Sequence, residues 1–387
     1  MAKLSKIKVT EEYYENLYAS KIEVPQTDKP LDNSDIPDIT KDEVVFALRN
    51  MKLGKAPGQD GITTDLLEDA GEILHKALAQ LFTQCIRERK IPKNLCLGIV
   101  ILLHKKGDKR DLGNYRPITL LPNIYKLFTK ILTNRLTGTL DENQPREQAG
   151  FRSGYSTIDH LHAINQLIEK SLEYNKPLCL AFVDYEKAFD SVEHTAVFNS
   201  MREQGVNENY IETIKNIYEN GTAIIRLHKS TNEIKIAKGV RQGDTISPKL
   251  FTACLESIFR KTDWEGMGIN VDGEYLNHLR FADDISLTTE AAEELQNMLN
   301  DLNRESKKVG LKMNRKKTKV MFNDKAQKKV IKIDGETLEE VDEYIYLGQV
   351  IKLEKYHDSE IKRRITIGWK AFGMNRDILK SKMPMCL

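Results

Sequence analysis

Two short runs of alternating hydrophobic and polar positions predict a β-hairpin over residues 278–287. Because successive side chains of a strand point to opposite faces, this period of two fixes the register of the two acids between the runs, Asp283 and Asp284. The apolar positions are Leu279, Phe281, Ile285 and Leu287. Adjacent carboxylates repel each other, and a divalent cation is a physical reason to hold them together. A solvated turn explains the hairpin equally well when it is taken alone.

A continuous apolar run at residues 178–183 predicts a central strand that is buried on both faces. This strand ends at a third acid, Asp184. The long stretch of chain between Asp184 and the hairpin leaves room for several other elements. We therefore expect the strand and the hairpin to lie side by side, with the three acids at one end.

The remaining hydrophobic patterns predict helices interrupted by short strands. We expect helices near residues 44–51, 66–86, 125–136, 157–174 and 247–260, a strand at 96–103 and a β-hairpin near 223–240. The helix at 66–86 is expected to be continuous, with Leu66 and Ile73 on its buried face. Residues 1–40 are expected to be a weakly ordered lead-in, because prolines at positions 25, 30 and 37 interrupt any regular element.

Composition predicts a folded protein that is neither secreted nor embedded in a membrane. Hydrophobic residues make up 40% of the 387 positions, enough for two or three modules with cores of their own. The longest apolar run, 95–103, is too short to span a bilayer, and the N-terminus lacks the apolar core of a signal peptide. We expect an intracellular protein, in the nucleus or the cytoplasm. The five cysteines lack zinc-binding spacing, and most are expected to be buried rather than disulfide-bonded.

The net charge of +2 conceals a strong segregation of charge along the chain. Residues 11–43 carry ten acids and three bases, whereas residues 301–330 carry eleven bases and three acids. A second basic stretch runs over residues 105–135. Separated basic stretches around a carboxylate centre indicate a polyanion held against metal ions. Solvated charged helices would account equally well for any single stretch.

Two loops carry polar groups that are suited to phosphate contacts. Residues 104–111 form a basic, glycine-containing tip between apolar segments. The segment 239–248 combines glycines, which permit close approach of the backbone, with the side-chain amide of Gln242. Taken alone, this second segment is an ordinary junction between a loop and a helix.

Eight segments of the chain, taken in order, resemble the reverse transcriptases of non-LTR (LINE-type) retrotransposons, nearest to the RTE-like elements. The segments are KAPGQDGI, NYRPITLL, QAGFRSGYSTIDH, AFVDYEKAFDSV, GVRQGDTISPKLF, RFADDISL, GLKMNRKKTKVM and YLGQVI. The resemblance covers about residues 41–352 and implies an α+β, right-hand polymerase fold. It implies, after the lead-in, helical fingers (41–177), a palm of antiparallel sheet backed by helices (178–325), a primer-grip-like hairpin region (326–355) and a partial thumb helix (356–387).

The resemblance also implies roles for individual residues. Asp184, Asp283 and Asp284 would be the catalytic acids, and with the carbonyl of Tyr185 they would bind two Mg²⁺ ions, or Mn²⁺ in their place. Two such ions can activate a primer 3′-hydroxyl and stabilise the leaving pyrophosphate. The residues implied to contact the nucleotide are Phe189, Gln242, Gly243, Arg116, Lys105 and Lys317, and those implied to contact the primer are Tyr346, Leu347 and Gly348.

The resulting prediction is an RNA-directed DNA polymerase whose partners are an RNA template, a DNA primer and deoxynucleoside triphosphates, with no membrane partner. The ring of Phe189 would crowd a ribose 2′-hydroxyl, which favours this activity over an RNA-directed RNA polymerase. A non-enzymatic nucleic-acid-binding remnant of a transposon and an intron-encoded maturase are two further candidates. The sequence leaves open the oligomeric state and whether this is a truncated copy.

Overall fold

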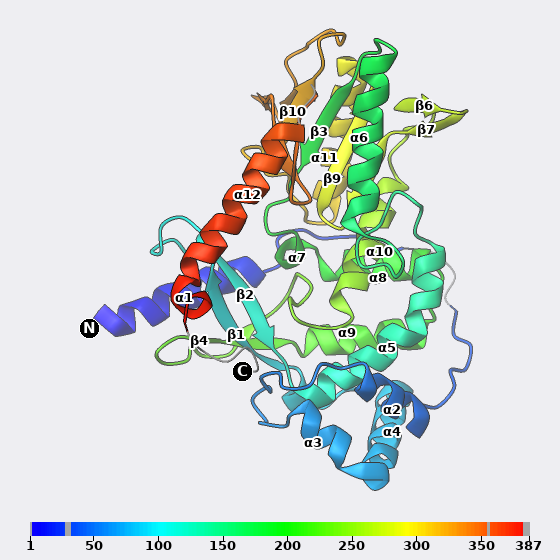
Figure 1. Cartoon of the computed structure of the whole chain (residues 1–387). Coiled ribbons are helices and arrows are strands. Elements are labelled where there is room, and N and C mark those ends of the chain that lie inside the picture. The colour runs from blue at the N-terminus through cyan, green and yellow to red at the C-terminus, as the bar shows by residue number, and fades with distance from the viewer. Residues whose placement is uncertain (1, 28–31, 354–356, 382–387) are drawn as a thin grey trace. The chain divides into compact units, whose positions relative to one another are not determined.

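A computed structural model describes residues 2–27, 32–353 and 357–381. The chain divides into two compact units, and Figure 1 labels their elements. The first unit comprises the described parts of residues 1–153, 185–263 and 301–313, and the second comprises those of residues 154–184, 264–300 and 314–387. Both units combine helices with mainly antiparallel strands, so the predicted α+β class is confirmed. The predicted boundaries between fingers, palm and thumb stay a prediction.

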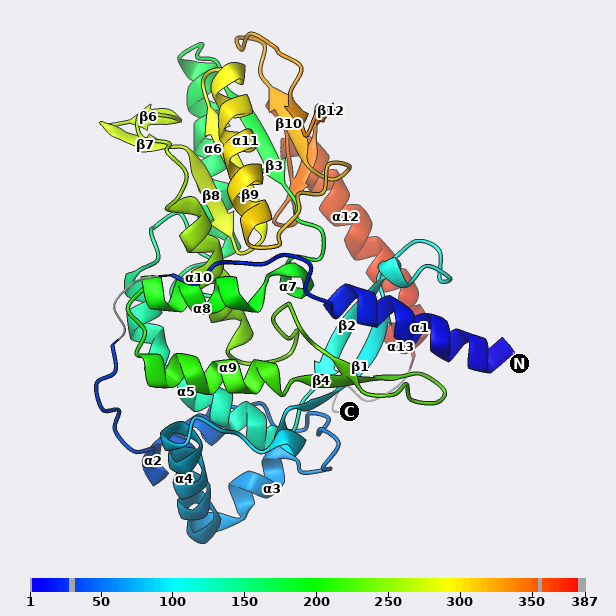
Figure 2. The same ribbon diagram turned by 180° about the vertical axis from the view of Figure 1, so that it is seen from behind.

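The first unit surrounds a four-stranded sheet with helices. Its helices include α2 (Lys41–Arg49), α5 (Asn123–Glu142), α7 (Ala188–Ser191), α8 (His194–Glu203), α9 (Glu208–Glu219) and α10 (Ser247–Phe259). Its strands are β1 (Leu97–His104), β2 (Tyr115–Leu120), β4 (Thr222–Arg226) and β5 (Ile234–Lys235), in the order β2-β1-β4-β5. Helices α8 and α9 pack side by side, as Figure 2 shows.

The predicted lack of regular structure in residues 1–40 is wrong, because helix α1 (Ala2–Tyr18) fills the first half of this segment. All three prolines follow the helix in the sequence. Two side chains of α1, Tyr14 and Tyr18, are 1% and 5% exposed and belong to a hydrophobic cluster with Ile225 and Ile234. The helix is therefore stabilised by packing on the sheet, which the local sequence does not reveal.

The single helix predicted for residues 66–86 is also wrong in detail. The segment forms two helices, α3 (Thr64–Asp69) and α4 (Gly71–Arg87), which are separated by Ala70. Gly71 has a φ of +76°, a conformation that glycine adopts at little cost and that interrupts the helical path. Leu66 and Ile73, predicted to be buried, are 61% and 86% exposed. The break rotates them away from the core that the continuous helix would have faced.

The second unit is built on a five-stranded sheet in the order β13-β10-β3-β9-β8. Its strands are β3 (Cys179–Val183), β8 (His278–Phe281), β9 (Asp284–Thr289), β10 (Lys319–Phe322) and β13 (Glu339–Glu340). All five residues of β3 are buried, which confirms the predicted central strand. Only the edge pair β10–β13 is parallel among these strand pairs.

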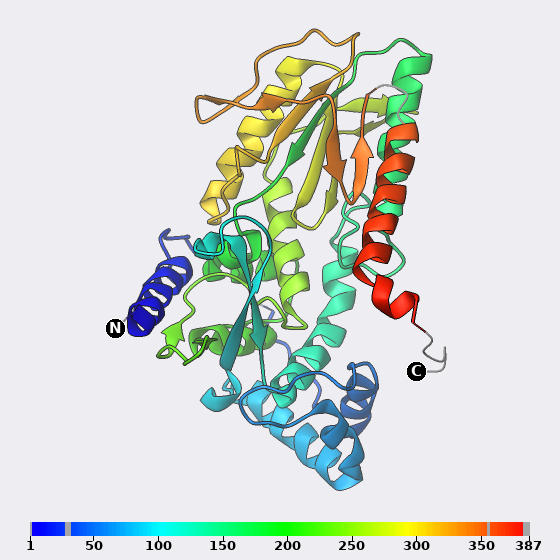
Figure 3. The same ribbon diagram turned by 60° about the vertical axis from the view of Figure 1, so that its left-hand side comes forward.

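Two helices cover opposite faces of this sheet, as Figure 3 shows. Helix α6 (Thr157–Glu173) contributes Ile164 and Ile168 to the hydrophobic core with Leu180 and Phe182 of β3. Helix α11 (Ala292–Lys308), whose residues up to 300 belong to this unit, covers the other face. The sheet therefore presents a packed, rigid support for the residues at its strand ends.

Smaller elements complete the second unit. They are the hairpins β6 (Ile269–Val271) with β7 (Glu274–Leu276), β11 (Lys332–Ile333) with β12 (Glu336–Thr337) and β14 (Tyr344–Tyr346) with β15 (Gln349–Ile351), followed by helices α12 (His357–Met374) and α13 (Arg376–Leu379). The large apolar side chains along one face of α12 (Ile361, Ile365, Trp369 and Phe372) are exposed, Trp369 by 67%. Residues 354–356 and 382–387 of the predicted hairpin and thumb regions lie outside the described residues.

The cysteines behave as small apolar residues wherever the structure describes them. Cys85, Cys96, Cys179 and Cys254 are all buried, which confirms the prediction for these four positions. Burial raises the pKa of the Cys85 and Cys96 thiols to about 11. Cys386 lies outside the described residues.

Candidate active site

The three acids are brought together by strand pairing in the second unit. Strands β3 and β9 are antiparallel with Val183 opposite Ile285, so Asp184 leaves β3 at the end where Asp284 begins β9. Strands β8 and β9 form the predicted hairpin, in which Phe281 pairs with Asp284 across a two-residue turn. Asp283 is the second residue of that turn. The sequence-based prediction that the two segments meet at one end is confirmed.

The electrostatic fields of the three carboxylates overlap. The pKa of Asp284 is raised to about 6, first by loss of hydration and then by repulsion from Asp283 and Asp184, with the Lys317 ammonium acting in the opposite direction. Asp284 is nevertheless exposed, so its carboxylate can be reached from solvent. The pKa of the neighbouring Tyr344 is raised to about 12 by burial and then by Asp184 and Asp284. Repulsion of this kind favours binding of a cation.

Lys317 contributes a positive charge to this cluster. Its ammonium Nζ lies 2.9 and 3.2 Å from the two carboxylate oxygens of Asp184. A turn that begins at Asn314 holds both partners, because the Asn314 amide donates to the carbonyl of Asp184 at 2.7 Å and the Lys317 amide donates to the carbonyl of Asn314 at 3.1 Å. The family resemblance implied that Lys317 contacts the nucleotide; the structure pairs its ammonium with Asp184, and the nucleotide contact stays a prediction.

The donor atoms of the cluster are all oxygens, which are the ligands that Mg²⁺ prefers. Across residues 2–27, 32–353 and 357–381, however, no three His, Cys, Asp or Glu side chains are close enough together to hold a metal ion. Because Lys317 engages both oxygens of Asp184, cation binding would require its ammonium to move away. Tyr185 belongs to the first unit, and the proposed role of its carbonyl stays a prediction.

In the first unit, the loop that contains Gln242 and Gly243 docks on strand β2. The Thr119 amide donates to the carbonyl of Gln242 at 2.9 Å. Gly243 has a φ of +110°, and a Cβ there would lie 2.7 Å from the carbonyl oxygen of Thr119. Only glycine permits this close approach without a shift of the backbone. The side-chain amide of Gln242 is therefore carried on a backbone whose path is fixed.

Phe189 is held by other aromatic rings of the first unit. Its ring stacks on Phe251 with 4.6 Å between centroids and meets Phe151 edge-to-face at 6.2 Å. The side chain is half-buried, so part of the ring stays accessible. A ring that is packed on one side and accessible on another can act as a steric boundary for a ligand.

Arg116 and Lys105 lie near each other on the pair β1–β2. Leu103 of β1 pairs with Arg116 of β2, and the Lys105 amide donates to the carbonyl of Asn114 at 2.9 Å. Both side chains are exposed. Both cations also act on one carboxyl group, Asp190, whose pKa they lower against a larger effect of burial. The structure thus places Gln242 in hydrogen-bond contact with Asp190, with Arg116 and Lys105 close enough to lower its pKa; the sequence analysis had not singled out Asp190.

Asp190 could have been found from the sequence by its position. It is a carboxylate next to Phe189, in the same segment as Asp184. What the sequence lacked was any sign that this acid is buried and that its partner would be Gln242.

The predicted primer contact is a tight hairpin turn in the second unit. Tyr346 pairs with Gln349, and the two residues between them, Leu347 and Gly348, have φ values of 46° and 84°. The Tyr346 ring is buried against Phe182, with 5.2 Å between centroids. Two guanidinium groups of α12, those of Arg363 and Arg364, donate to the carbonyl of Gly348 and stabilise the turn. The contact with a primer stays a prediction.

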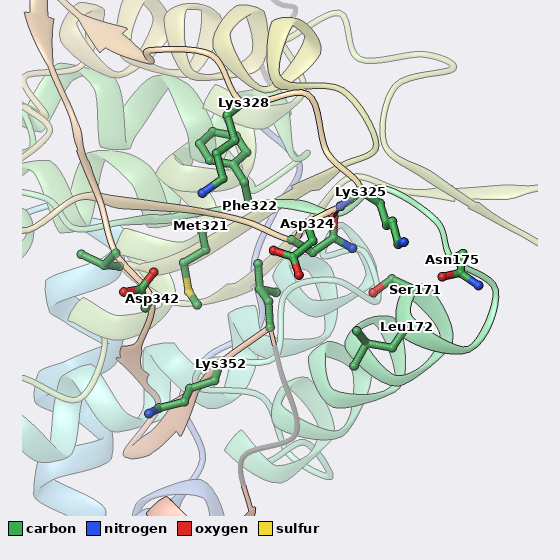
Figure 4. Close-up of a pocket in the computed structure, with 13 residues that line it drawn as sticks. Ser171, Leu172, Asn175, Met321, Phe322, Asp324, Lys325, Lys328, Asp342 and Lys352 are labelled. Atoms are coloured by element: carbon green, nitrogen blue, oxygen red, sulfur yellow. Dashed lines mark hydrogen bonds between the residues drawn. The ribbon is translucent and has the colours of Figure 1, made fainter.

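A cavity of about 400 Å³ lies elsewhere in the second unit, between the end of α6 and strand β10 (Figure 4). Two lysines at its rim are already paired: Lys328 lies 2.5 Å from Glu340 and Lys352 lies 2.8 Å from Glu343. None of the predicted site residues lines this cavity. It is therefore distinct from the candidate active site.

Comparison with known proteins identifies the class to which this fold and this cluster of acids belong. Residues 103–351 match the reverse transcriptase (RNA-dependent DNA polymerase) family. The chain belongs to this family.

Particular relatives support the same grouping. The protein of transposon BS from Drosophila melanogaster, named a probable RNA-directed DNA polymerase, is 28% identical over 394 residues, which cover 98% of this chain and 42% of that protein. The 149 kDa protein of transposon TX1 from Xenopus laevis is 28% identical over 219 residues, which cover 56% of this chain and 17% of that protein. The chain thus spans less than half the length of these two relatives.

Among solved structures, truncated apo telomerase from Candida tropicalis is similar with a TM-score of 0.49 and 14% identity, over 72% of this chain and 59% of that one. No helix in the described ranges combines the length and the apolarity that a membrane crossing requires.

Proposed function

We propose that the chain is an RNA-directed DNA polymerase of an RTE-like element, which extends a primer 3′-hydroxyl with deoxynucleoside triphosphates on an RNA template. The observation that carries the proposal is the convergence of Asp184, Asp283 and Asp284 at the ends of paired strands, with their charges coupled. A packing role does not explain three carboxylates in mutual repulsion.

The second unit would supply the acids, with Asp184, Asp283 and Asp284 holding two Mg²⁺ ions. Bound there, the ions would activate the attacking hydroxyl and neutralise the leaving pyrophosphate. The ammonium of Lys317 would leave Asp184 as the ions bind, and it would then be available to the phosphates. A flexible lysine can make such an exchange because its ammonium is a compact charge on a long stem.

The nucleotide contacts would come from Arg116, Lys105, Gln242 and Phe189. Arg116 and Lys105 are exposed cations that can neutralise a triphosphate, which is the main requirement of phosphoryl transfer besides positioning. Gln242 offers a side-chain amide on a fixed loop. The accessible part of the Phe189 ring would exclude a ribose 2′-hydroxyl.

Primer extension by the purified chain tests the proposal. On an RNA template annealed to a DNA primer, with Mg²⁺ and deoxynucleotides, the wild-type chain should extend the primer. Asp283→Asn should reduce the rate by several orders of magnitude, because it removes a ligand charge, and should leave template–primer binding nearly unchanged. The matched control is Asp272→Asn, which removes an exposed acid at the tip of the β6–β7 hairpin. Equal extension by both variants would show that the metal assignment is wrong.

A second candidate is a nucleic-acid-binding protein without polymerase activity. Two observations favour it. In the described part of the chain, no three acids are close enough together to hold a cation, and the Lys317 ammonium is bound to the carboxylate of Asp184. A wild-type chain that binds template–primer but extends it with neither Mg²⁺ nor Mn²⁺ would support this second candidate.

A further inference from the structure

Asp190 is a buried acid of the first unit, and no lysine, arginine or histidine among the described residues forms an ion pair with it. Its side chain is 5% exposed. Among the described residues, its carboxylate accepts side-chain hydrogen bonds from a single group, the Nε2 of Gln242, at 3.2 and 3.1 Å from its two oxygens. Burying a carboxylate with so few donors is costly, so stability alone gives no reason for an acid here.

The surroundings of Asp190 leave little room for water. Tyr14 and Tyr18 of α1 lie close enough to Asp190 for its charge to add to the effect of burial, which raises the pKa of both hydroxyls. Tyr18 also lines, together with Asp190 and Gln242, a cavity of about 10 Å³, which has room for about one water molecule. The cations that face Asp190 are Lys187, Lys105 and Arg116, and they act on it from a distance.

Lys187 is itself committed elsewhere. Its ammonium donates to the hydroxyl of Tyr13 and lies 4.6 Å from the centre of that ring. The closest contact of the Lys187 ammonium is therefore with Tyr13 and not with the Asp190 carboxylate. Among the described side chains, Asp190 accepts hydrogen bonds only from the amide of Gln242.

The backbone around this pair is locked. The Val240 amide donates to the carbonyl of Phe189 at 2.6 Å, and the Gly239 amide donates to the carbonyl of Val192 at 2.7 Å. A Cβ on Gly239 would lie 2.8 Å from backbone atoms of Asp190. The loop that carries Gln242 thus sits directly on the turn that carries Phe189 and Asp190.

A side-chain amide can present either its NH₂ group or its oxygen, and the two ends are similar in shape. A carboxylate accepts only, so Asp190 selects the orientation in which Nε2 of Gln242 points toward it. We propose that Asp190 is a positioning residue that fixes the Gln242 amide for the incoming deoxynucleoside triphosphate. This inference rests on the proposed polymerase function and on the placement of Gln242 beside the nucleotide.

Steady-state primer extension with a double-mutant cycle tests the inference. Asp190→Leu removes the acceptor and should raise the apparent KM for deoxynucleotides by about tenfold or more, the usual effect of losing a hydrogen bond to a charged group. The kcat and the affinity for template–primer should change little. Asp190→Asn keeps one acceptor oxygen and should raise this KM less. In a Gln242→Ala background, neither substitution should raise the KM further.

The matched control is Glu208→Gln, which removes another buried carboxylate of the first unit, one that pairs with Arg202. It should leave the KM for nucleotides unchanged. If Asp190→Leu does not fold, the double-mutant cycle is measured with Asp190→Asn and Gln242→Ala only.

The outcomes separate the two proposals. Suppose that the wild-type chain extends primers, but the effects of the Asp190 and Gln242 substitutions on the KM for deoxynucleotides multiply in the double variant. This result would overturn the positioning role and leave the polymerase proposal intact. A loss of template–primer affinity equal to the loss for nucleotides would do the same. A wild-type chain that extends no primer would overturn both.

Discussion

The substitution Asp190→Asn should stabilise the first unit, and by an amount that depends on pH. Burial raises the pKa of Asp190 from 3.8 to about 6 in the folded chain, against the smaller opposing effects of Lys187 and Gln242. Two pKa units correspond to about 3 kcal/mol. The folded state binds the proton of Asp190 more tightly than the unfolded state does. The loss in free energy of unfolding that the charged carboxylate causes is therefore absent below about pH 4, grows as pH rises, and is complete above about pH 6. Asparagine has nearly the same shape and no charge, so it avoids this penalty.

Urea denaturation at pH 4.5 and pH 7.5 measures the effect. The advantage of Asp190→Asn in free energy of unfolding should grow by roughly 2 kcal/mol between these pH values. Pulse-labelling hydrogen exchange on peptides from α8 and α9 would follow the first unit by itself, since both tryptophans lie in the second. Asp272→Asn controls for the change in net charge. An advantage that is the same at both pH values would show that Asp190 is not charged and desolvated in the folded chain.

Three further predictions concern activity. Phe189→Val should admit ribonucleotides with little loss of deoxynucleotide use, because a smaller side chain leaves room for a 2′-hydroxyl; unchanged discrimination in competition assays would reject Phe189 as the boundary. Arg116→Lys should raise the KM for nucleotides more than the KM for template–primer, because lysine lacks the planar fork that matches phosphate oxygens; equal effects would place Arg116 elsewhere. Within the described residues α12 exposes its apolar face, so it does not pack there as part of a helical bundle that could enclose a duplex. Template–primer binding should therefore be weak and should fall steeply as the salt concentration rises, and synthesis should be distributive. Long products from single binding events in a trap-challenge assay would contradict this.

The sequence by itself determined the local parts of the candidate site. The alternation around Asp283 and the apolar run before Asp184 gave a hairpin and a central strand, and both are present. These signals are reliable because burial of a strand leaves a period of two, or an unbroken apolar run, in neighbouring positions. The turn at Leu347 and Gly348 was implied only by the family resemblance, because leucine rarely adopts the positive φ that it has there.

Local signals failed where distant packing decided the outcome. The helix α1 was missed because Tyr14 and Tyr18 become buried only against strands β1, β4 and β5, which come much later in the chain. The break at Gly71 was missed because helical spacing continues across it, and only the fold shows that Ile73 faces solvent.

Only the tertiary structure decided which charged groups meet. Lys317 pairs with Asp184 across 133 positions, and Gln242 pairs with Asp190 across 52. A sequence states the charge of each residue but not its burial or its partner, and these two properties set the cost of the charge and the direction of its pKa shift. The acids of the proposed catalytic centre could therefore be named from the sequence, whereas the groups that hold and tune the candidate site emerged from the fold alone.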